Sequence, residues 1–309
     1  MYSNNCFLQE MRISCICQNE YKYFLRKLNV IGVGLGYKIT NGLYTKNICI
    51  TVFVKEKLPN NMLPSNEIIP NFYKGFLTDV VDCAGLPKFQ SLTSKVRPVI
   101  CGYSVGNILY NDSGGTCGCL VRDNYLYMLS SNHVLAKTNE APLNSSIVQP
   151  AVQYGGKTPG NIVAFLKKFI PLKFIEGRSE PKNQVDCAIV KVFNKSLASP
   201  EIAFVGVPKG IGKPKLNEPV KKVGATSELT DGRITNLSTT ILMDCGSKQA
   251  LFTNQIITTK ITDPGDSGAL LLDENNNALG LCMGGINQIT VSNSISLVLK
   301  NLKVNLVTS

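Results

Sequence analysis

The residues most suited to covalent chemistry lie in the tetrapeptide Gly265-Asp266-Ser267-Gly268, which is followed by an apolar run, 269–272. A nucleophilic serine needs a tight turn that exposes its hydroxyl and points backbone N–H groups at a developing oxyanion. Glycines on both sides of Ser267 permit such a turn, because glycine adopts backbone conformations that other residues avoid. An ordinary turn before a strand is the alternative, and the tetrapeptide alone does not decide between the two.

A serine nucleophile requires a base, and the chain contains a single histidine, His133. An imidazole is the side chain whose ordinary pKa suits proton transfer near neutral pH. The apolar run 125–129, typical of a strand, ends shortly before His133, which places the imidazole in a short polar turn at the mouth of that strand. A lone histidine is more often a surface or core residue, so the assignment depends on the presence of Ser267.

The imidazole in turn needs a carboxylate to orient it. Between His133 and Ser267 the acidic candidates include Glu140, Glu176, Glu180, Asp186, Glu201, Glu218, Glu228, Asp231 and Asp244. Asp186 differs from the others because it directly precedes a continuous apolar run, 187–190. A partly buried carboxylate is unfavourable unless it accepts a hydrogen bond from a group such as an imidazole N–H. We therefore expect Asp186 to orient His133; capping a turn is the alternative role.

The order His133, Asp186, Ser267 along the chain is that of chymotrypsin-like enzymes and not of the subtilisins or the α/β-hydrolases. Five sequence motifs accompany these residues: Gly114-Gly115-Thr116, Ser131-Asn132-His133-Val134-Leu135-Ala136, Val185-Asp186-Cys187-Ala188-Ile189, Val223-Gly224-Ala225-Thr226 and Gly265-Asp266-Ser267-Gly268. On these motifs, residues 97–309 resemble the chymotrypsin/trypsin-like serine peptidase superfamily in its bacterial, non-secreted form.

The resemblance implies a mainly β fold, a chymotrypsin-like pair of six-stranded β-barrels with the active site in the cleft between them. It implies that His133 is the general base, Asp186 its orienting group and Ser267 the nucleophile. The N–H groups of Gly265 and Ser267 would form the oxyanion hole, and Asp266 would be a buried carboxylate that supports the turn. A catalytically silent peptide-binding module of the same fold is the alternative function.

The resemblance also places a specificity pocket, with Ile261 at its base and Met283, Gly284 and Gly285 in its wall. An isoleucine offers no carboxylate, so a substrate Arg or Lys would be buried unpaired at a cost of several kcal/mol. Paired glycines leave room for a side chain, and a methionine adapts to its shape. We expect cleavage after uncharged apolar residues such as Leu, Met or Phe. An insertion of one residue before Ser267 would instead bring Thr262 or Asp263 to the pocket.

The sequence departs from the family pattern in three places. Val134 stands where a cysteine usually follows the histidine, so the disulfide that brackets that histidine is absent. Ala225 stands where an arginine is common. No activation-cleavage sequence of the animal zymogen kind precedes the domain, which argues against activation by a freed amino terminus at Asp266.

Short apolar runs separated by turn residues make up the chain after residue 99. Strands are predicted at 125–129, 148–152, 162–166, 185–192, 203–207, 239–243, 255–259, 269–272 and 278–283, and a terminal helix at 295–302. This density of strands without intervening helices is typical of barrels or a sandwich. The pattern therefore agrees with a peptidase domain over residues 93–309.

The first ninety residues have a different pattern. A helix is predicted over 7–28, strands over 30–37, 48–54 and 78–81, a hairpin turn at Asn41-Gly42 and a linker near 85–97. Gly32, Gly34 and Gly36 do not form a dinucleotide loop, because the next element is a hairpin and not a helix. We expect residues 1–92 to be a small α+β domain that regulates the peptidase, with a regulatory partner, or recruits its substrate; a role in assembly is the alternative.

Composition excludes several classes of protein. With 309 residues, 44% of them hydrophobic, and a mean hydropathy of +0.06, the chain is not disordered. No apolar run approaches the roughly 20 residues that span a bilayer, and we expect no signal peptide in the first residues, where Glu10 and Arg12 precede any long apolar stretch. The chain has eleven cysteines, an odd number that cannot all pair within it, and several of them lie in apolar runs. This favours free thiols in a reducing cytoplasm.

Charge and cysteine spacing exclude other partners. The net charge is +11, but the lysines are scattered, and Lys167-Lys168 and Lys221-Lys222 are the nearest approach to clusters. We therefore expect no specific nucleic acid and no membrane as partner. Cys15 and Cys17, like Cys117 and Cys119, are too closely spaced for structural zinc. No metal and no cofactor are expected, and a protein or peptide is the expected substrate.

Overall fold

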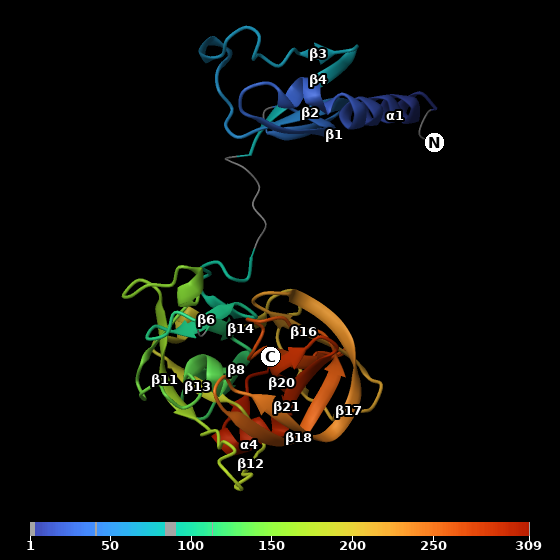
Figure 1. Ribbon diagram of the computed structural model, residues 1–309. Helices are drawn as coiled ribbons and strands as arrows, with labels where there is room; N and C mark the ends of the chain where they lie inside the picture. Colours follow the sequence, from blue (N-terminus) through green and yellow to red (C-terminus); the bar gives the residue numbers. More distant parts are fainter. Residues whose placement is uncertain (1–3, 41, 84–90, 113, 309) are drawn as a thin grey trace. The chain divides into compact units, whose positions relative to one another are not determined.

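The computed structural model describes residues 4–40, 42–83, 91–112 and 114–308. The chain divides into two compact units, 1–89 and 90–309, and each is described by itself (Figure 1). Asn41 and residues 84–90, which include the first part of the predicted linker, lie outside the described residues. Leu92 packs in the core of the larger unit with 1% of its surface exposed, so that core begins one residue before the predicted boundary at 93.

The small unit is a four-stranded sheet with helices packed against it, an α+β arrangement as predicted (Figure 1). Its elements are α1 (Asn4–Asn19), α2 (Tyr21–Leu25), β1 (Val30–Thr40), β2 (Leu43–Val54), η1 (Asn60–Met62), β3 (Phe72–Tyr73) and β4 (Phe76–Asp82), and the strand order is β1-β2-β4-β3. The hairpin pairs Thr40 with Leu43, and β2 runs parallel to β4. The predicted single helix is two helices.

Glycines on β1 let a neighbouring aromatic ring lie close to the strand. A Cβ placed on Gly32 would lie 3.4 Å from the ring of Phe53, and one on Gly34 would lie 3.6 Å from it. On the opposite face, Ile13 and Phe24 of the helices pack in a core with Ile50 of β2. The glycines therefore belong to a packed strand.

The first half of the larger unit is a β-sheet that coils toward a barrel, drawn mainly in green in Figure 1, with β22 from the red end of the chain at its edge. Its strands are β6 (Ser104–Asn107), β7 (Gly114–Thr116), β8 (Cys119–Arg122), β9 (Leu126–Ser130), β10 (Ser146–Val148), β11 (Ile162–Phe169), β13 (Ala188–Val192) and β22 (Asn305–Leu306), in the order β22-β8-β9-β13-β11-β10-β6-β7. The one-turn helix α3 (Asn132–Leu135) follows β9, and β5 (Val99–Cys101) pairs with β14 (Ala198–Ile202).

The second half is a closed barrel, drawn in orange and red in Figure 1. Its strands are β16 (Pro219–Gly224), β17 (Glu228–Asp244), β18 (Gln249–Thr259), β19 (Leu270–Asp273), β20 (Asn277–Ile286) and β21 (Ile289–Ser294). The ring runs β16-β17-β18-β21-β20-β19, and β19 pairs with β16 to close it. Short strands β12 (Lys182–Asn183) and β15 (Gly210–Ile211) lie on its edges, and α4 (Ile295–Leu302) is the predicted terminal helix.

Apolar side chains join the two halves of the larger unit. The main core cluster contains Leu129 and Val190 of the first half, Leu270 and Leu281 of the second, and Val298 of α4. Burial of this shared apolar surface, worth about 25 cal/mol per Å², fixes the two halves against each other. The mainly β, chymotrypsin-like architecture expected from the sequence is confirmed.

Two predicted strands differ from the structure for identifiable reasons. The strand predicted over 148–152 ends at Val148, because Pro150 has no N–H to donate to a ladder. The residues predicted as a strand over 203–207 form a turn, in which Phe204 (φ 65°) and Gly206 (φ 86°) take the left-handed conformation. The strand there is β14, whose sequence Ala-Ser-Pro-Glu-Ile is too polar to be recognised by its pattern.

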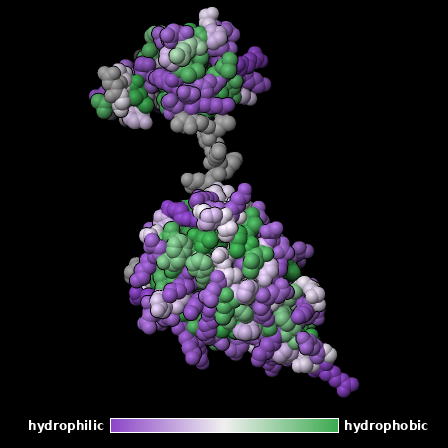
Figure 2. All heavy atoms as spheres, turned by 90° about the vertical axis from the view of Figure 1, so that its left-hand side faces the viewer, coloured by the Kyte–Doolittle hydropathy of each residue, from purple (hydrophilic) through white to green (hydrophobic). Residues whose placement is uncertain are grey.

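None of the helices in the described ranges is both long enough and apolar enough to cross a membrane. The face of the larger unit seen in Figure 2 carries its apolar residues in several patches among hydrophilic ones. The apolar surface on that face is therefore interrupted by polar side chains.

Candidate active site

The first barrel brings His133 and Asp186 together. The antiparallel pair β9 and β13 sets Ser130 opposite Ala188, so α3, which follows β9, begins beside the residues that precede β13. The N–H of His133 donates to Oδ1 of Asp186 at 3.2 Å, and Nδ1 of the imidazole is hydrogen-bonded to Oδ2. The predicted base and its predicted carboxylate are therefore in direct contact.

Asp186 is held from the second barrel. Its side chain is 3% exposed, and its own N–H donates to Oδ1 of Asn293 on β21 at 2.8 Å. Asn293 is itself buried and donates through Nδ2 to the carbonyl oxygen of Leu281 at 3.2 Å. Asn293 is not among the residues expected from the sequence, because it lies in an ordinary polar stretch and only the packing of the two barrels brings it to Asp186.

The environment of His133 favours the charged imidazolium. Burial by itself lowers the pKa of His133, but the charge of Asp186 and the hydrogen bond to it outweigh that effect. The pKa of His133 is therefore raised above its ordinary value of 6.5. The side chain stays 33% exposed, so a substrate can reach the ring.

Ser267 lies on the turn between β18 and β19, and two positions of that turn require glycine. Gly265 (φ +104°) and Gly268 (φ +91°) are both in the left-handed region. A Cβ on Gly268 would lie 2.0 Å from Oγ of Ser130, and one on Gly265 would lie 2.2 Å from Oγ1 of Thr226. The glycines predicted to permit the turn are therefore required by both conformation and space.

The backbone of this turn leaves two N–H groups unpaired. Asp266, Gly268 and Ala269 donate their N–H groups to carbonyl oxygens at 2.8–3.0 Å. Across the described part of the chain, the N–H groups of Gly265 and Ser267 find no protein acceptor. Two unpaired donors on either side of Asp266 form the arrangement that an oxyanion requires.

A threonine fixes the orientation of one of these donors. Oγ1 of Thr226 donates to the carbonyl oxygen of Pro264 at 2.8 Å. The C=O and N–H of one trans peptide point in opposite directions, so this bond also sets the direction of the Gly265 N–H. Oγ1 of Thr116 donates to the carbonyl oxygen of Gly265 at 2.9 Å and fixes the next peptide.

Ser267 lies close to the segment that carries His133. A Cβ on Gly115 would contact both the side chain of Val134 and, at 2.7 Å, the carbonyl oxygen of Ser267. The Ser267 hydroxyl donates to the carbonyl oxygen of Met283 at 3.0 Å and not to the His133 imidazole. In the described conformation the Ser267 hydroxyl is therefore held by the backbone of β20.

Asp266 is fully buried beneath the turn, as expected. Its carboxylate accepts from the N–H groups of Asp263, Thr226 and Ser227 at 2.8–3.1 Å and from Nζ of Lys222 at 2.9 Å. Desolvation raises the pKa of Asp266, but these hydrogen bonds and the lysine charge outweigh it and lower the pKa below its usual value. Asp266 is therefore an ionised carboxylate at neutral pH.

The predicted pocket residues occupy two environments. Ile261 instead packs in the core of the second barrel, 3% exposed, and its side chain would lie 2.5 Å from a Cβ on Gly232. The residue beside the predicted wall is Thr262, whose hydroxyl would lie 3.1 Å from a Cβ on Gly285 and is 2.8 Å from the hydroxyl of Thr290. Thr262, one residue after Ile261, is therefore the residue that lies next to Gly285.

The other predicted pocket residues lie on β20. Met283 is 4% exposed and packs with Val291, and a Cβ on Gly284 would meet the end of the Met243 side chain at 3.6 Å. Asp263 is the carboxylate nearest to Ile261 in the sequence, and it forms a 2.7 Å ion pair with Lys260. The negative charge of Asp263 is therefore compensated by the lysine.

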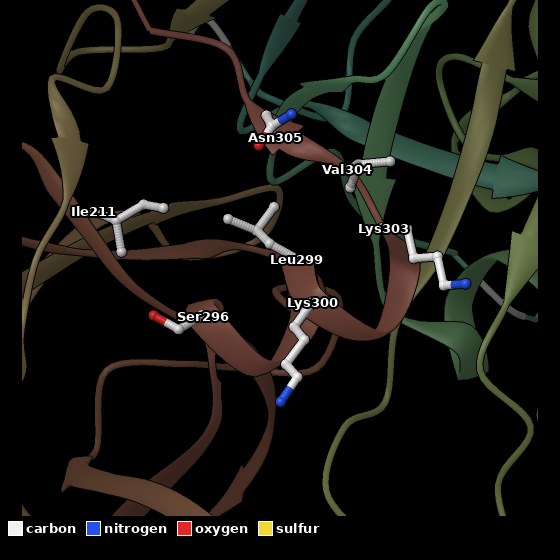
Figure 3. A pocket seen from close by; sticks show the side chains of 7 residues that line it. All are labelled: Ile211, Ser296, Leu299, Lys300, Lys303, Val304 and Asn305. Carbon is white, nitrogen blue, oxygen red and sulfur yellow. The ribbon is translucent and has the colours of Figure 1, made fainter.

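A pocket of about 370 Å³ lies elsewhere on the larger unit, beside α4. Figure 3 shows Ile211 and Leu299 pointing toward one another across it, while Lys300 and Lys303 extend away. Its lining contains no imidazole, carboxylate or thiol, so it lacks a base for hydrolysis. No group of three or more metal-ligating side chains occurs among the residues that the structure describes.

The family model for the trypsin-like peptidase domain matches residues 115–281, more than half of the chain. The chain belongs to the trypsin-like peptidase family. The matched span of this trypsin-like peptidase contains His133, Asp186 and Ser267. A second model, the NARROW LEAF 1 N-terminal domain, matches residues 7–84. No curated protein matches the chain.

Solved structures of serine proteases have the fold of this trypsin-like peptidase. Protease A of Thermobifida fusca is 18% identical, with a TM-score of 0.51, and the match covers 68% of this chain and 98% of that one. Cellulomonas bogoriensis chymotrypsin is 19% identical, with a TM-score of 0.49 over 68% and 99% of the two chains. A glutamic acid-specific serine protease that uses a histidine triad in substrate binding is 20% identical, with a TM-score of 0.49 over 68% and 100%.

Proposed function

We propose that this trypsin-like peptidase is a serine endopeptidase in which His133 is the general base, Asp186 orients it and Ser267 is the nucleophile. The observation that carries the proposal is the turn at Ser267. It leaves the N–H groups of Gly265 and Ser267 unpaired beside the segment that holds the His133–Asp186 pair.

In the proposed reaction the Ser267 hydroxyl leaves the carbonyl oxygen of Met283 and donates to Nε2 of His133. The imidazole takes the proton as the serine oxygen attacks the peptide carbonyl, and Asp186 stabilises the imidazolium through Nδ1. The two unpaired N–H groups donate to the tetrahedral oxyanion. His133 then protonates the leaving amine, and water hydrolyses the acyl-enzyme by the same route.

Covalent labelling of the full-length protein by a fluorophosphonate probe tests this function. The probe is expected to label the wild type on Ser267 and to leave the Ser267→Ala variant unlabelled. Ser296→Ala is the matched control and is expected to label normally, because Ser296 lies outside the site. A wild type that binds peptides but is not labelled is instead the peptide-binding module.

The pH dependence of kcat/KM reports the ionisation of His133, because only neutral imidazole accepts the serine proton. Activity is expected to rise with pH through one ionisation above 6.5, since Asp186 raises the pKa of His133. In Asp186→Asn the rise in activity moves to lower pH and turnover falls. A flat profile between pH 5 and pH 9 contradicts the assignment.

Diethyl pyrocarbonate is expected to inactivate the protein with one modified histidine per chain, the single His133.

We further propose that cleavage follows uncharged residues, since Asp263 is paired with Lys260 and the hydroxyls of Thr262 and Thr290 supply no negative charge. A peptide library is expected to give little cleavage after Arg or Lys. The variant Thr262→Asp adds a carboxylate beside Gly285, and we expect it to raise the relative cleavage after Lys or Arg by about tenfold. A wild-type preference for Arg or Lys contradicts the proposal.

Residues 1–89 are proposed to regulate the peptidase or recruit its substrate. We expect a fragment that starts at residue 91 to fold and to react with the fluorophosphonate probe. A fragment that starts at residue 93 loses the buried Leu92, whose carbonyl oxygen accepts from Ser104 N–H at 2.8 Å, and is expected to be less stable by about 3 kcal/mol. Urea unfolding of the two fragments measures the difference, and equal stability contradicts it.

We also propose a cytoplasmic location. The ten cysteines that the structure describes are free, and six of them are buried. Free thiols in such number persist in a reducing compartment.

A further inference from the structure

Lys222 is a buried charge that the proposed reaction does not use. It lies on β16, where side chains alternate between the two faces of the strand, and its side chain is fully buried. Its Nζ lies 2.9 Å from Oδ2 of Asp266, 2.5 Å from Oγ of Ser227 and 3.1 Å from the carbonyl oxygen of Glu228. A buried ammonium is costly unless it is paired and hydrogen-bonded. Here its counter-charge is Asp266, on the turn that carries Ser267, and its other two partners lie where β16 leads into β17.

The partner of Lys222 lies between the two unpaired donors of that turn. Asp266 stands between Gly265 and Ser267, and its carboxylate also accepts from the N–H of Asp263 in the same turn. A displacement of Asp266 that carries its backbone with it therefore moves the N–H groups on both sides. Gly224 also leaves no spare room, since a Cβ there would lie 2.4 Å from Oδ1 of Asp266. Without the Lys222 charge, Asp266 would be a buried carboxylate lacking a counter-charge, and rotation toward water would relieve it by disordering the turn.

We propose that Lys222 is a positioning residue: its ammonium, supplied from inside the fold, holds Asp266 and thereby keeps the Gly265 and Ser267 N–H groups in place. The turn is then assembled in the intact chain, and no amino terminus has to be released by cleavage to complete it. The proposal rests on the proposed serine-peptidase function.

Kinetics of the full-length protein test the positioning role. Oxyanion hydrogen bonds act in the transition state, so Lys222→Met is expected to lower kcat for an amide substrate by about 100-fold while KM changes by less than about threefold. Lys222→Arg keeps the charge and is expected to remain within about tenfold of wild type. Lys221→Met is the matched control, because this neighbouring lysine on β16 is partly exposed and contacts the carbonyl oxygen of Glu274, and it is expected to be unchanged.

Three outcomes overturn the proposal. They are wild-type kcat in Lys222→Met, an equal fall in Lys221→Met, and a rise in KM with kcat unchanged. If Lys222→Met cannot be obtained as a folded protein, Lys222→Arg is the deciding variant. A fall in its kcat by about 100-fold would show that the positive charge is not what Lys222 supplies.

A second measurement separates this proposal from the function on which it rests. Amide hydrogen exchange of residues 263–269 is measured in the Ser267→Ala background, where no turnover contributes. Lys222→Met is expected to speed this exchange by about tenfold or more, and Lys221→Met is expected to leave it unchanged. Faster exchange together with an inactive wild type refutes the peptidase function alone, whereas unchanged exchange refutes the role of Lys222.

The independence from cleavage has its own test. The full-length chain with an added amino-terminal tag is expected to be active and to be labelled by the fluorophosphonate at the same rate before and after proteolytic removal of the tag. Labelling that appears only after such cleavage overturns the proposal.

Discussion

Ser267→Ala and His133→Ala are each expected to lower peptide hydrolysis by on the order of 10⁶-fold, and the double variant is expected to be scarcely worse. The reason is that the two residues act as one unit, since a serine without its base is as unreactive as a base without its serine. Turnover of a peptide substrate by the full-length protein measures the loss. Labelling of each preparation with the fluorophosphonate shows whether another serine protease contaminates it.

Asp186→Asn separates the orienting group from the rest of the site. This variant keeps the shape of the side chain, and both His133 contacts, at the N–H and at Nδ1, meet the 186 side chain. Turnover is expected to fall by about 10⁴-fold, because the amide favours the wrong imidazole tautomer. Asp231→Asn and Asp244→Asn are the controls. Near-normal turnover in Asp186→Asn with a loss in either control would assign the orienting role elsewhere.

Gly268→Ala is expected to abolish fluorophosphonate labelling and to lower the free energy of unfolding by roughly 2–5 kcal/mol. Its φ of +91° is strained for alanine, and the added Cβ would lie 2.0 Å from Oγ of Ser130 and 2.5 Å from the carbonyl oxygen of Thr116. These two atoms are hydrogen-bonded to each other, with the Ser130 hydroxyl donating to the carbonyl oxygen of Thr116 at 2.6 Å. Moving either of them away from the new Cβ would break that bond. Urea unfolding and the labelling rate are the measurements.

Gly160→Ala is the matched control for this substitution. A Cβ on Gly160 meets no heavy atom within 4 Å of it, so the alanine is expected to leave both stability and labelling close to wild type. A Gly268→Ala variant that behaves like Gly160→Ala would show that the turn tolerates a side chain, contrary to its geometry.

The sequence by itself determined the class of fold and the identity of the candidate catalytic residues. Short apolar runs with turn residues between them predict a mainly β larger unit, because alternation and glycine punctuation are local properties. The order of His133, Asp186 and Ser267, with glycines on both sides of the serine, is equally local and needs no coordinates. The contact between His133 and Asp186 agrees with this assignment, and the catalytic roles are left to the variants above.

Tertiary structure alone decided what supports those residues. In the sequence Lys222 is one of two adjacent lysines. Because side chains alternate along a strand, Lys222 is buried inside the barrel whereas Lys221 is partly exposed. Thr262 takes the place beside Gly285, and Ile261 takes the core, because one residue along a chain reverses the face to which a side chain points. Asn293 reaches Asp186 from 107 residues away. Such partners are set by barrel closure and by the burial of charge, which depend on distances in space that local sequence patterns do not contain.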